Sequence, residues 1–164
     1  MTIYAANFDP QDSDFEQFAQ QIIELDPRQE KLRGASNQDG DDGLYRNTET
    51  GELTTVEAKH LRQYTALPQK YLINIDEAAA RNSETYNAPC RRVIVTTSDS
   101  LTQGAKAKKR QIQKRNIIEI IDYSCLKKIS NDPSTPSDLA QGIKSSLAKK
   151  GRRTEGEIKH KRET

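Results

Sequence analysis

The chain has 164 residues, of which 33% are hydrophobic and 30% are charged, and its net charge is +2. This length fits one domain, and no apolar run approaches the roughly 18 residues that cross a bilayer. The start of the sequence also lacks the basic and apolar regions of a signal peptide, so we expect a cytoplasmic protein with no membrane partner. The two widely spaced cysteines indicate neither a disulfide framework nor a zinc site.

The charges are distributed unevenly along the chain. Acidic residues predominate before His60, and basic residues predominate after it. An acidic region that holds metal, next to a basic region that attracts a phosphate backbone, suits a phosphodiester substrate. The distribution therefore favours nucleic acid as a partner.

The first predicted helix covers residues 14 to 25. Its apolar side chains recur at helical spacing, and they are Phe15, Phe18, Ile22 and Leu25. Ser13 or Asp14 is the natural N-cap, and Pro27 lies just beyond the end. Residues 28 to 42 then show no strong apolar period, which predicts an irregular approach to the next element or a short edge strand.

A β-hairpin is predicted within residues 40 to 59. Turn-forming residues at 47 to 51 separate a short run that ends at Arg46 from a run rich in β-branched residues. If the loop spans 48 to 51, Asn47 faces Glu52 and, further along, Asp42 faces Glu57. Because strand side chains alternate between faces, Glu57 and Lys59 share one face. The hairpin thus brings Asp42, Glu57 and Lys59 to one patch.

Chemistry at this patch can be argued from the residue types. Two opposed carboxylates repel each other unless a cation lies between them. Mg²⁺, with Mn²⁺ as a substitute, prefers one or two carboxylates together with waters and phosphate oxygens. Lys59 would position or activate a water and offset charge on a phosphate. The alternative is a surface hairpin whose charges are merely solvated.

The middle of the chain predicts a βαβ unit that follows a second helix. Pro68 suits the first position of that helix, which runs to about residue 81, and Gln69 at its start is a candidate to face the hairpin. Apolar runs at 91 to 98 and 117 to 122 predict two parallel strands covered on both faces, and 123 to 129 a short helix.

Between the two strands, residues 101 to 115 predict a helix with a thin apolar side and Ser100 as a possible cap. Its basic side chains are Lys106, Lys108, Lys109, Arg110, Lys114 and Arg115. They form a candidate surface for binding nucleic-acid phosphates. The alternative is a solvated helix face.

The C-terminal part is read as a tail. Prolines, serines and threonines follow Asn131, and basic residues follow them. Leu139, Ile143 and Leu147 fit a marginal helix, but little apolar material comes after them. We therefore assign residues 1 to 130 to a folded domain and residues 131 to 164 to a basic, flexible tail that attracts nucleic acid.

The order of these features resembles that of the PD-(D/E)XK nucleases, in the restriction-endonuclease-like branch that includes the Mrr type of restriction enzymes. The matching segments are 15–18, 39–43, 56–59, 93–98, 104–107 and 120–122. The resemblance implies a single α/β domain in which helices flank a mixed β-sheet. Position by position, Asp42 and Glu57 would hold Mg²⁺, and Lys59 would be the catalytic lysine. The family's Gly-Gly-Ile-Asp pattern is one residue shorter here, so Asp41 competes with Asp42 for the metal, although the hairpin register favours Asp42.

The resemblance implies a Mg²⁺-dependent DNA endonuclease of restriction, defence or mobile-element biology, acting as a homodimer or as a subunit of a larger complex. In many nucleases an acidic residue of the first helix reaches the metal, which makes Glu16 an accessory candidate beside Gln69. The alternative for Glu16 is a first-turn acid that the helix dipole favours. Alternative functions are a Holliday-junction-resolving enzyme, a catalytically inactive nucleic-acid-binding subunit on the same fold, and a basic globular protein with no nucleic-acid role.

Overall fold

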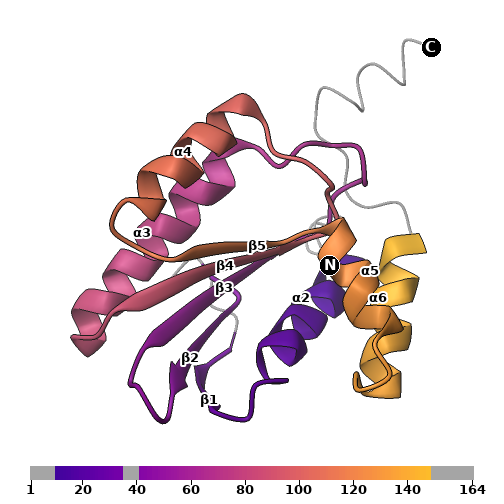
Figure 1. Cartoon of the computed structure of the whole chain (residues 1–164), viewed down its shortest axis with the longest axis horizontal. Coiled ribbons are helices and arrows are strands. Elements are labelled where there is room, and N and C mark those ends of the chain that lie inside the picture. The colour runs from indigo at the N-terminus through magenta and orange to yellow at the C-terminus, as the bar shows by residue number, and fades with distance from the viewer. Residues whose placement is uncertain (1–9, 35–40, 149–164) are drawn as a thin grey trace, which may run out of the picture.

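The computed structural model describes residues 10–34 and 41–148, with side chains from residue 14 onward. A mixed sheet of five strands forms its centre, in the spatial order β1-β2-β3-β4-β5 (Figure 1). The strands are β1 (Gln29–Arg33), β2 (Gly43–Asn47), β3 (Leu53–Lys59), β4 (Cys90–Thr96) and β5 (Ile118–Ile121). The pairs β1–β2 and β2–β3 are antiparallel, whereas the pairs β3–β4 and β4–β5 are parallel.

Helices cover both faces of the sheet (Figure 1). One face carries α3 (Gln69–Tyr86) and α4 (Gln103–Gln113), and the other carries α2 (Pro10–Ile23), α5 (Tyr123–Asn131) and α6 (Ser137–Ala148). Alternate residues of β4 serve the two faces, because Val93 and Val95 pack in the core with α2, α5 and α6, whereas Ile94 packs with α3 and α4. The predicted α/β fold, a single domain with a mixed sheet flanked by helices, is confirmed, and it is consistent with a restriction-endonuclease-like fold.

The hairpin of β2 and β3 has the predicted register. Gly43 lies opposite Val56, and Arg46 lies opposite Leu53. In the loop, the side-chain oxygen of Asn47 accepts hydrogen bonds from the backbone N–H groups of residues 49 and 50, at 2.9 and 3.1 Å. Gly51 closes the loop with a φ of +78°, a conformation that glycine adopts without strain. Local turn chemistry therefore fixes the register that brings the carboxylates together.

Several predicted boundaries shift in the structure. Helix α2 begins at Pro10 rather than at residue 14, and it ends at Ile23, so that Leu25 is 42% exposed instead of part of the apolar stripe. Proline is compatible with the first turn of a helix, where no hydrogen bond is lost. The predicted irregular approach contains the edge strand β1. Helix α4 is capped by Thr102 rather than Ser100, with the hydroxyl of Thr102 accepting from Ala105 N at 3.1 Å.

The predicted tail is wrong between residues 131 and 148. Helix α5 continues to Asn131, and α6 packs on α2 and α5 with Leu139 and Ile143 buried. The backbone of Gly142 lies so close to Phe18 that an added Cβ would come within 2.3 Å of the ring. The sparse apolar residues of α6 suffice because α2 and α5 supply a ready-made apolar surface. Residues 149 to 164 lie outside the described part of the chain, so the predicted tail is not tested there.

Within residues 10–34 and 41–148, no helix is long and apolar enough to cross a bilayer.

Candidate active site

Glu57 and Lys59 project from β3 toward the face that α3 covers. Lys59 Nζ lies 3.1 Å from Glu57 Oε1, and it also lies 4.5 Å from the ring centre of Tyr71 on α3. The intervening Ala58 points to the other core, as strand alternation requires. The side chain of Glu57 is almost completely buried. The two side chains therefore form an ion pair between a buried carboxylate and a partly exposed ammonium group.

Asp42 is held at the end of the β2–β3 ladder, directly beside β3. Its backbone N–H donates to Val56 O at 2.8 Å, and its carboxylate Oδ2 accepts the N–H of Ala58 at 2.7 Å. The carboxylate thus takes the place of a ladder carbonyl. From α2, Gln20 Nε2 donates to the backbone oxygen of Asp42 at 2.7 Å. These contacts orient Asp42 toward the strand that carries Glu57 and Lys59.

Asp41 has different partners from Asp42. Its carboxylate forms an ion pair with Arg33 of β1 and accepts a hydrogen bond from Asn82 of α3 at 3.0 Å. The side chain of Asp41 is 0% exposed. Asn82 also donates to Thr55 Oγ1 at 2.8 Å, so the network ties β1, β3 and α3 together. Asp41 is thus held by partners on β1 and α3, whereas Asp42 is held against the backbone of β3.

The electrostatics of the pair are set by burial. Burial raises the pKa of Glu57 to about 7; the negative charges of Asp42 and Asp41 add to this, and Lys59 opposes it. For Lys59, burial alone would lower the pKa, but the Glu57 carboxylate beside it makes the net shift upward. Lys59 is therefore protonated at neutral pH, whereas Glu57 titrates near neutrality.

One oxygen of Glu57, Oε2, is buried without a hydrogen bond among the described residues. Leaving a buried carboxylate oxygen unpaired is costly, and a bound cation would remove that cost. No group of three or more histidine, cysteine, aspartate or glutamate side chains gathers within the described residues. Two carboxylates match the ligand demand of Mg²⁺, which keeps several waters and uses few protein ligands.

The two accessory candidates, Gln69 and Glu16, lie on different helices. Gln69, the first residue of α3, packs its side chain on α4, where a Cβ added to Gly104 would come within 2.8 Å of Gln69 Oε1. Glu16 is half-buried on α2, which covers the sheet face opposite Glu57. The Gln69 side chain thus packs between two helices, and Glu16 lies about one helical turn before Gln20, which hydrogen-bonds the backbone of Asp42.

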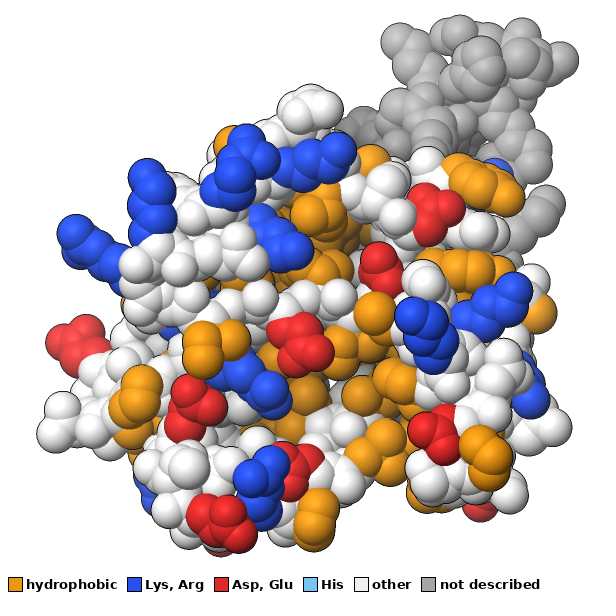
Figure 2. Space-filling model, in the orientation of Figure 1, with side chains coloured by type: hydrophobic (Ala, Val, Ile, Leu, Met, Phe, Trp, Pro, Cys, Tyr) orange, Lys and Arg blue, Asp and Glu red, His pale blue; other side chains and the backbone are white. Residues whose placement is uncertain are grey.

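The basic residues of the predicted nucleic-acid surface are divided between two regions. Figure 2 shows Lys and Arg side chains over α4. Lys106 is exposed in the first turn, near the end of the sheet that carries Lys59, whereas Lys108 Nζ lies 3.5 Å from Asp76 of α3. Lys109 is half-buried and Arg110 is exposed further along the helix.

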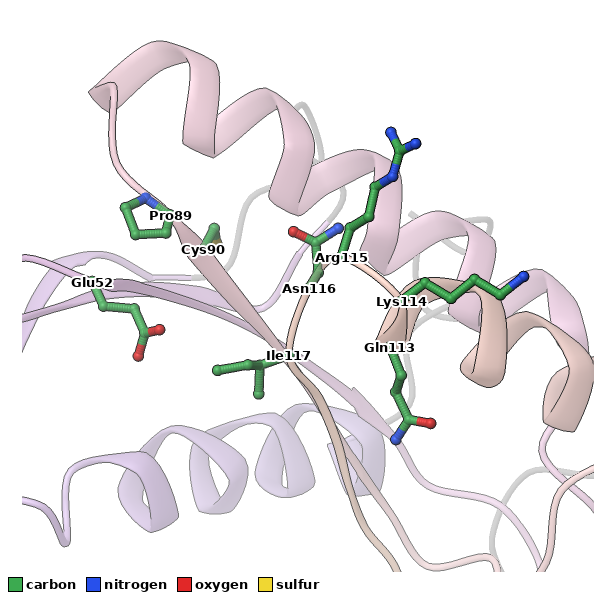
Figure 3. A pocket seen from close by; sticks show the side chains of 8 residues that line it. All are labelled: Glu52, Pro89, Cys90, Gln113, Lys114, Arg115, Asn116 and Ile117. Atoms are coloured by element: carbon green, nitrogen blue, oxygen red, sulfur yellow. The ribbon is translucent and has the colours of Figure 1, made fainter.

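Lys114 and Arg115 lie after α4, at the opposite end of the parallel strands. They line a pocket of about 360 Å³ together with Glu52, Pro89, Cys90, Gln113, Asn116 and Ile117 (Figure 3). The long side chains of Lys114 and Arg115 point outward rather than into the pocket (Figure 3). β3 and β4 begin at this end of the sheet, whereas Glu57 and Lys59 lie near the other end of β3. Lys114 and Arg115 are therefore remote from Glu57 and Lys59.

The sequence did not predict Gln20 and Asn82 as parts of the site. Gln20 follows the buried Ala19 of α2, and Asn82 follows the apolar stripe of α3, so a polar residue at the margin of an apolar stripe was the available signal. Which residues Gln20 and Asn82 contact depends on how α2 and α3 pack on the sheet. Because this packing joins segments far apart in the chain, the sequence did not reveal it.

Comparisons with other proteins give little further information. No protein-family model matches the sequence, and no curated protein sequence matches it. Among solved structures, the chain is similar to one in an EndoMS–dsDNA2 complex, with 20% sequence identity and a TM-score of 0.46. The similarity covers 66% of this chain and 44% of the other, so this chain spans less than half of that protein's length. A likeness this weak carries no argument about the function of this chain.

Proposed function

We propose that the chain is a metal-dependent DNA endonuclease domain of the PD-(D/E)XK type that hydrolyses phosphodiester bonds. The observation that carries this proposal is the buried, unpartnered Oε2 of Glu57, whose other oxygen pairs with Lys59 and whose neighbour is Asp42. A structural ion pair would be expected to satisfy both oxygens of a buried carboxylate. A carboxylate that binds a cation needs an oxygen that is not already hydrogen-bonded within the protein.

In this proposal Asp42 and Glu57 hold Mg²⁺ or Mn²⁺. The ion would supply Lewis-acid stabilisation of the phosphate charge and lower the pKa of a bound water. Asp42 is already oriented by the N–H of Ala58, so little reorganisation accompanies binding. Glu57 must lose its proton to act as a ligand, which ties metal binding to pH near neutrality.

Lys59 acts as a positive charge rather than as a base. Its pKa is raised by the Glu57 carboxylate despite the opposing effect of burial, so it stays protonated. A fixed ammonium group beside the scissile phosphate would offset the negative charge that develops in the transition state. Its N–H groups would also orient the attacking water.

The wider assignment follows from the same site. We expect the substrate backbone to approach the end of the sheet that carries Lys59, where Lys106 of α4 adds positive charge. Cutting both strands would require two such sites, as in a homodimer or in a larger complex with a DNA-reading subunit. Restriction, defence or mobile-element biology is the setting that suits such an enzyme.

A plasmid-nicking assay tests this proposal. The wild-type chain should convert supercoiled plasmid to nicked or linear forms with Mg²⁺ or Mn²⁺ and should fail to do so in EDTA. Asp42→Asn, Glu57→Gln and Lys59→Met should each lower the rate by at least about 100-fold, as loss of a transition-state contact does. Glu119→Gln, at an exposed position on β5, serves as the matched carboxylate control and should cut at the wild-type rate. Cleavage at the wild-type rate by both Asp42→Asn and Glu57→Gln would refute the proposal.

A further inference from the structure

The loop between β3 and α3 exposes a tyrosine close to the candidate active site. Tyr64 lies five positions after Lys59 and is 84% exposed, the highest value among large hydrophobic side chains in the described part of the chain. Single exposed apolar side chains are common on protein surfaces. The backbone that carries this ring, however, is firmly held.

Hydrogen bonds from the end of β4 fix the loop on both sides of Tyr64. Before Tyr64, Thr97 Oγ1 accepts a hydrogen bond from the N–H of Leu61 at 2.8 Å and donates one to the carbonyl oxygen of Leu61. The backbone N–H of Asp99 donates to the carbonyl oxygen of Gln63 at 2.9 Å. After Tyr64, Ser98 Oγ donates to the carbonyl oxygen of Thr65 at 2.6 Å. The side chains of Thr97 and Ser98 are buried. The ring therefore projects from a preorganised backbone, so that binding through it requires little further ordering of the loop.

Basic residues flank Tyr64 in the sequence, at Lys59, Arg62 and Lys70, while the backbone of the acidic Asp99 is bonded to the loop at Gln63. Arg62 Nε is buried and has no hydrogen-bond partner within the described residues. Lys59 and Lys70 both lie over the ring of Tyr71, at 4.5 and 5.1 Å from its centre. A protein interface needs a contiguous apolar centre. A single exposed ring on a segment flanked by basic residues instead suits a ligand that combines a flat aromatic group with phosphates.

We propose that Tyr64 stacks on an unpaired base of the substrate strand, so that the preferred substrate is DNA with unpaired bases near the cleaved phosphate. In the interior of a regular duplex both faces of each base are already stacked on neighbouring bases, so only the two end pairs have a face free for the ring. Aromatic side chains on which single-stranded bases stack are a general means of binding unpaired nucleic acid. The position of this contact relative to cleavage rests on the proposed function, but the stacking itself does not.

Binding measured in EDTA separates stacking from catalysis. The full chain is titrated into a fluorescently labelled single-stranded oligonucleotide, a blunt duplex of the same sequence, and a duplex with a central single-stranded gap. Tyr64→Ala should weaken binding to the single strand and to the gapped duplex by about tenfold, the effect of losing one base stack. Binding to the blunt duplex should change by less than about twofold. Comparison of the single-stranded and gapped arms shows which source of unpaired bases is preferred.

Two variants control for the loss of the tyrosine. Tyr64→Phe keeps the ring and should bind every substrate like the wild type. Tyr86→Ala removes another exposed tyrosine at the far end of α3 and should also leave binding unchanged. A 2-aminopurine base in the single strand should lose fluorescence on binding the wild type and Tyr64→Phe, and much less on binding Tyr64→Ala, because stacking on a ring quenches it.

Several outcomes would overturn the inference. Equal losses for single strand and blunt duplex would make Tyr64 a general backbone contact, and no loss for either would remove it from the nucleic-acid surface. A change in oligomeric state on Tyr64→Ala, without a change in binding, would assign the ring to a protein interface. By contrast, if Asp42→Asn and Glu57→Gln both cleave at the wild-type rate while Tyr64→Ala still loses single-strand binding, the proposed function fails and the stacking site stands.

Discussion

Glu57 combines three features that rarely serve stability: burial, a neighbouring carboxylate and an oxygen without a hydrogen bond among the described residues. Burial raises its pKa from 4.5 to about 7. The folded state therefore binds this proton more tightly than the unfolded state does. The contribution of the protonated Glu57 side chain to folding stability is fully present below pH 4.5, the pKa of Glu57 in the unfolded chain. That contribution is lost as the pH rises through about 7, its pKa in the folded state.

We predict that Glu57→Gln stabilises the metal-free protein above neutral pH. The uncharged amide removes the buried charge, and the gain at pH 8 should reach at most about 3 kcal/mol in the free energy of unfolding. Urea unfolding in EDTA between pH 5 and 8 measures it. The wild type should lose stability across this range, and the variant should lose much less. A destabilised variant at pH 8 would show that the ion pair with Lys59 outweighs the burial of Glu57.

Neutralising Asp41 should lower the stability of the fold more than neutralising Asp42. Asp41→Asn breaks the ion pair with Arg33 and should cost about 2 kcal/mol of stability, a moderate value because Arg33 is partly exposed. Asp42→Asn keeps an oxygen that accepts the N–H of Ala58, so its unfolding free energy should stay within about 1 kcal/mol of the wild type. Urea unfolding of both variants in EDTA makes the comparison. Equal stability losses would contradict the separate roles of the two carboxylates.

At the scale of secondary-structure elements, α6 belongs to the folded core rather than to a tail. Ile143 is completely buried, whereas Lys144 beside it is exposed. We predict that Ile143→Ala costs about 3 kcal/mol of unfolding free energy through lost burial and the cavity left behind. Lys144→Ala, the matched control, should change it by less than about 0.5 kcal/mol. A mobile tail would leave both variants as stable as the wild type, and thermal unfolding distinguishes the two cases.

The basic side chains of α4 differ in how free they are to meet a phosphate. Lys108 is drawn toward Asp76 and Gln111, while Lys106 is exposed near the Lys59 end of the sheet. We predict that Lys106→Ala reduces the slope of log affinity against log salt for duplex DNA by about 1, the effect of losing one phosphate contact. Lys108→Ala should have a smaller effect. Binding titrations in EDTA over a range of salt concentrations measure both slopes, and identical slopes for wild type and Lys106→Ala would exclude this contact.

At the scale of the whole molecule, local signals predicted the layout well. The turn formers at 47 to 51 set the hairpin register, and the β-branched runs at 91 to 98 and 117 to 122 marked the buried parallel strands. Each of these signals depends on neighbours in sequence. Because register follows from the turn, the approach of Asp42 to the part of β3 that carries Glu57 could also be predicted.

What the sequence could not show depends on contacts between distant segments. The ion pair of Asp41 with Arg33 requires β1 to pair with β2 across a register shift between Lys31 and Arg33. The burial of α6 requires the apolar surface that α2 and α5 provide together. The depth of Glu57, and hence its raised pKa, likewise depends on how α3 covers the sheet. Such features arise only when the layers are assembled.

The central claim is that Asp42 and Glu57 together hold a divalent metal ion, and titration calorimetry with Mn²⁺ tests it most directly. The wild type should bind Mn²⁺, with affinity that rises as the pH passes through about 7 because Glu57 must lose its proton. Asp42→Asn and Glu57→Gln should each weaken binding by at least about tenfold, whereas Asp41→Asn and Lys59→Met should keep the site. Binding of equal affinity in the wild type, Asp42→Asn and Glu57→Gln, or no binding by the wild type at any pH from 6 to 8, would contradict the claim.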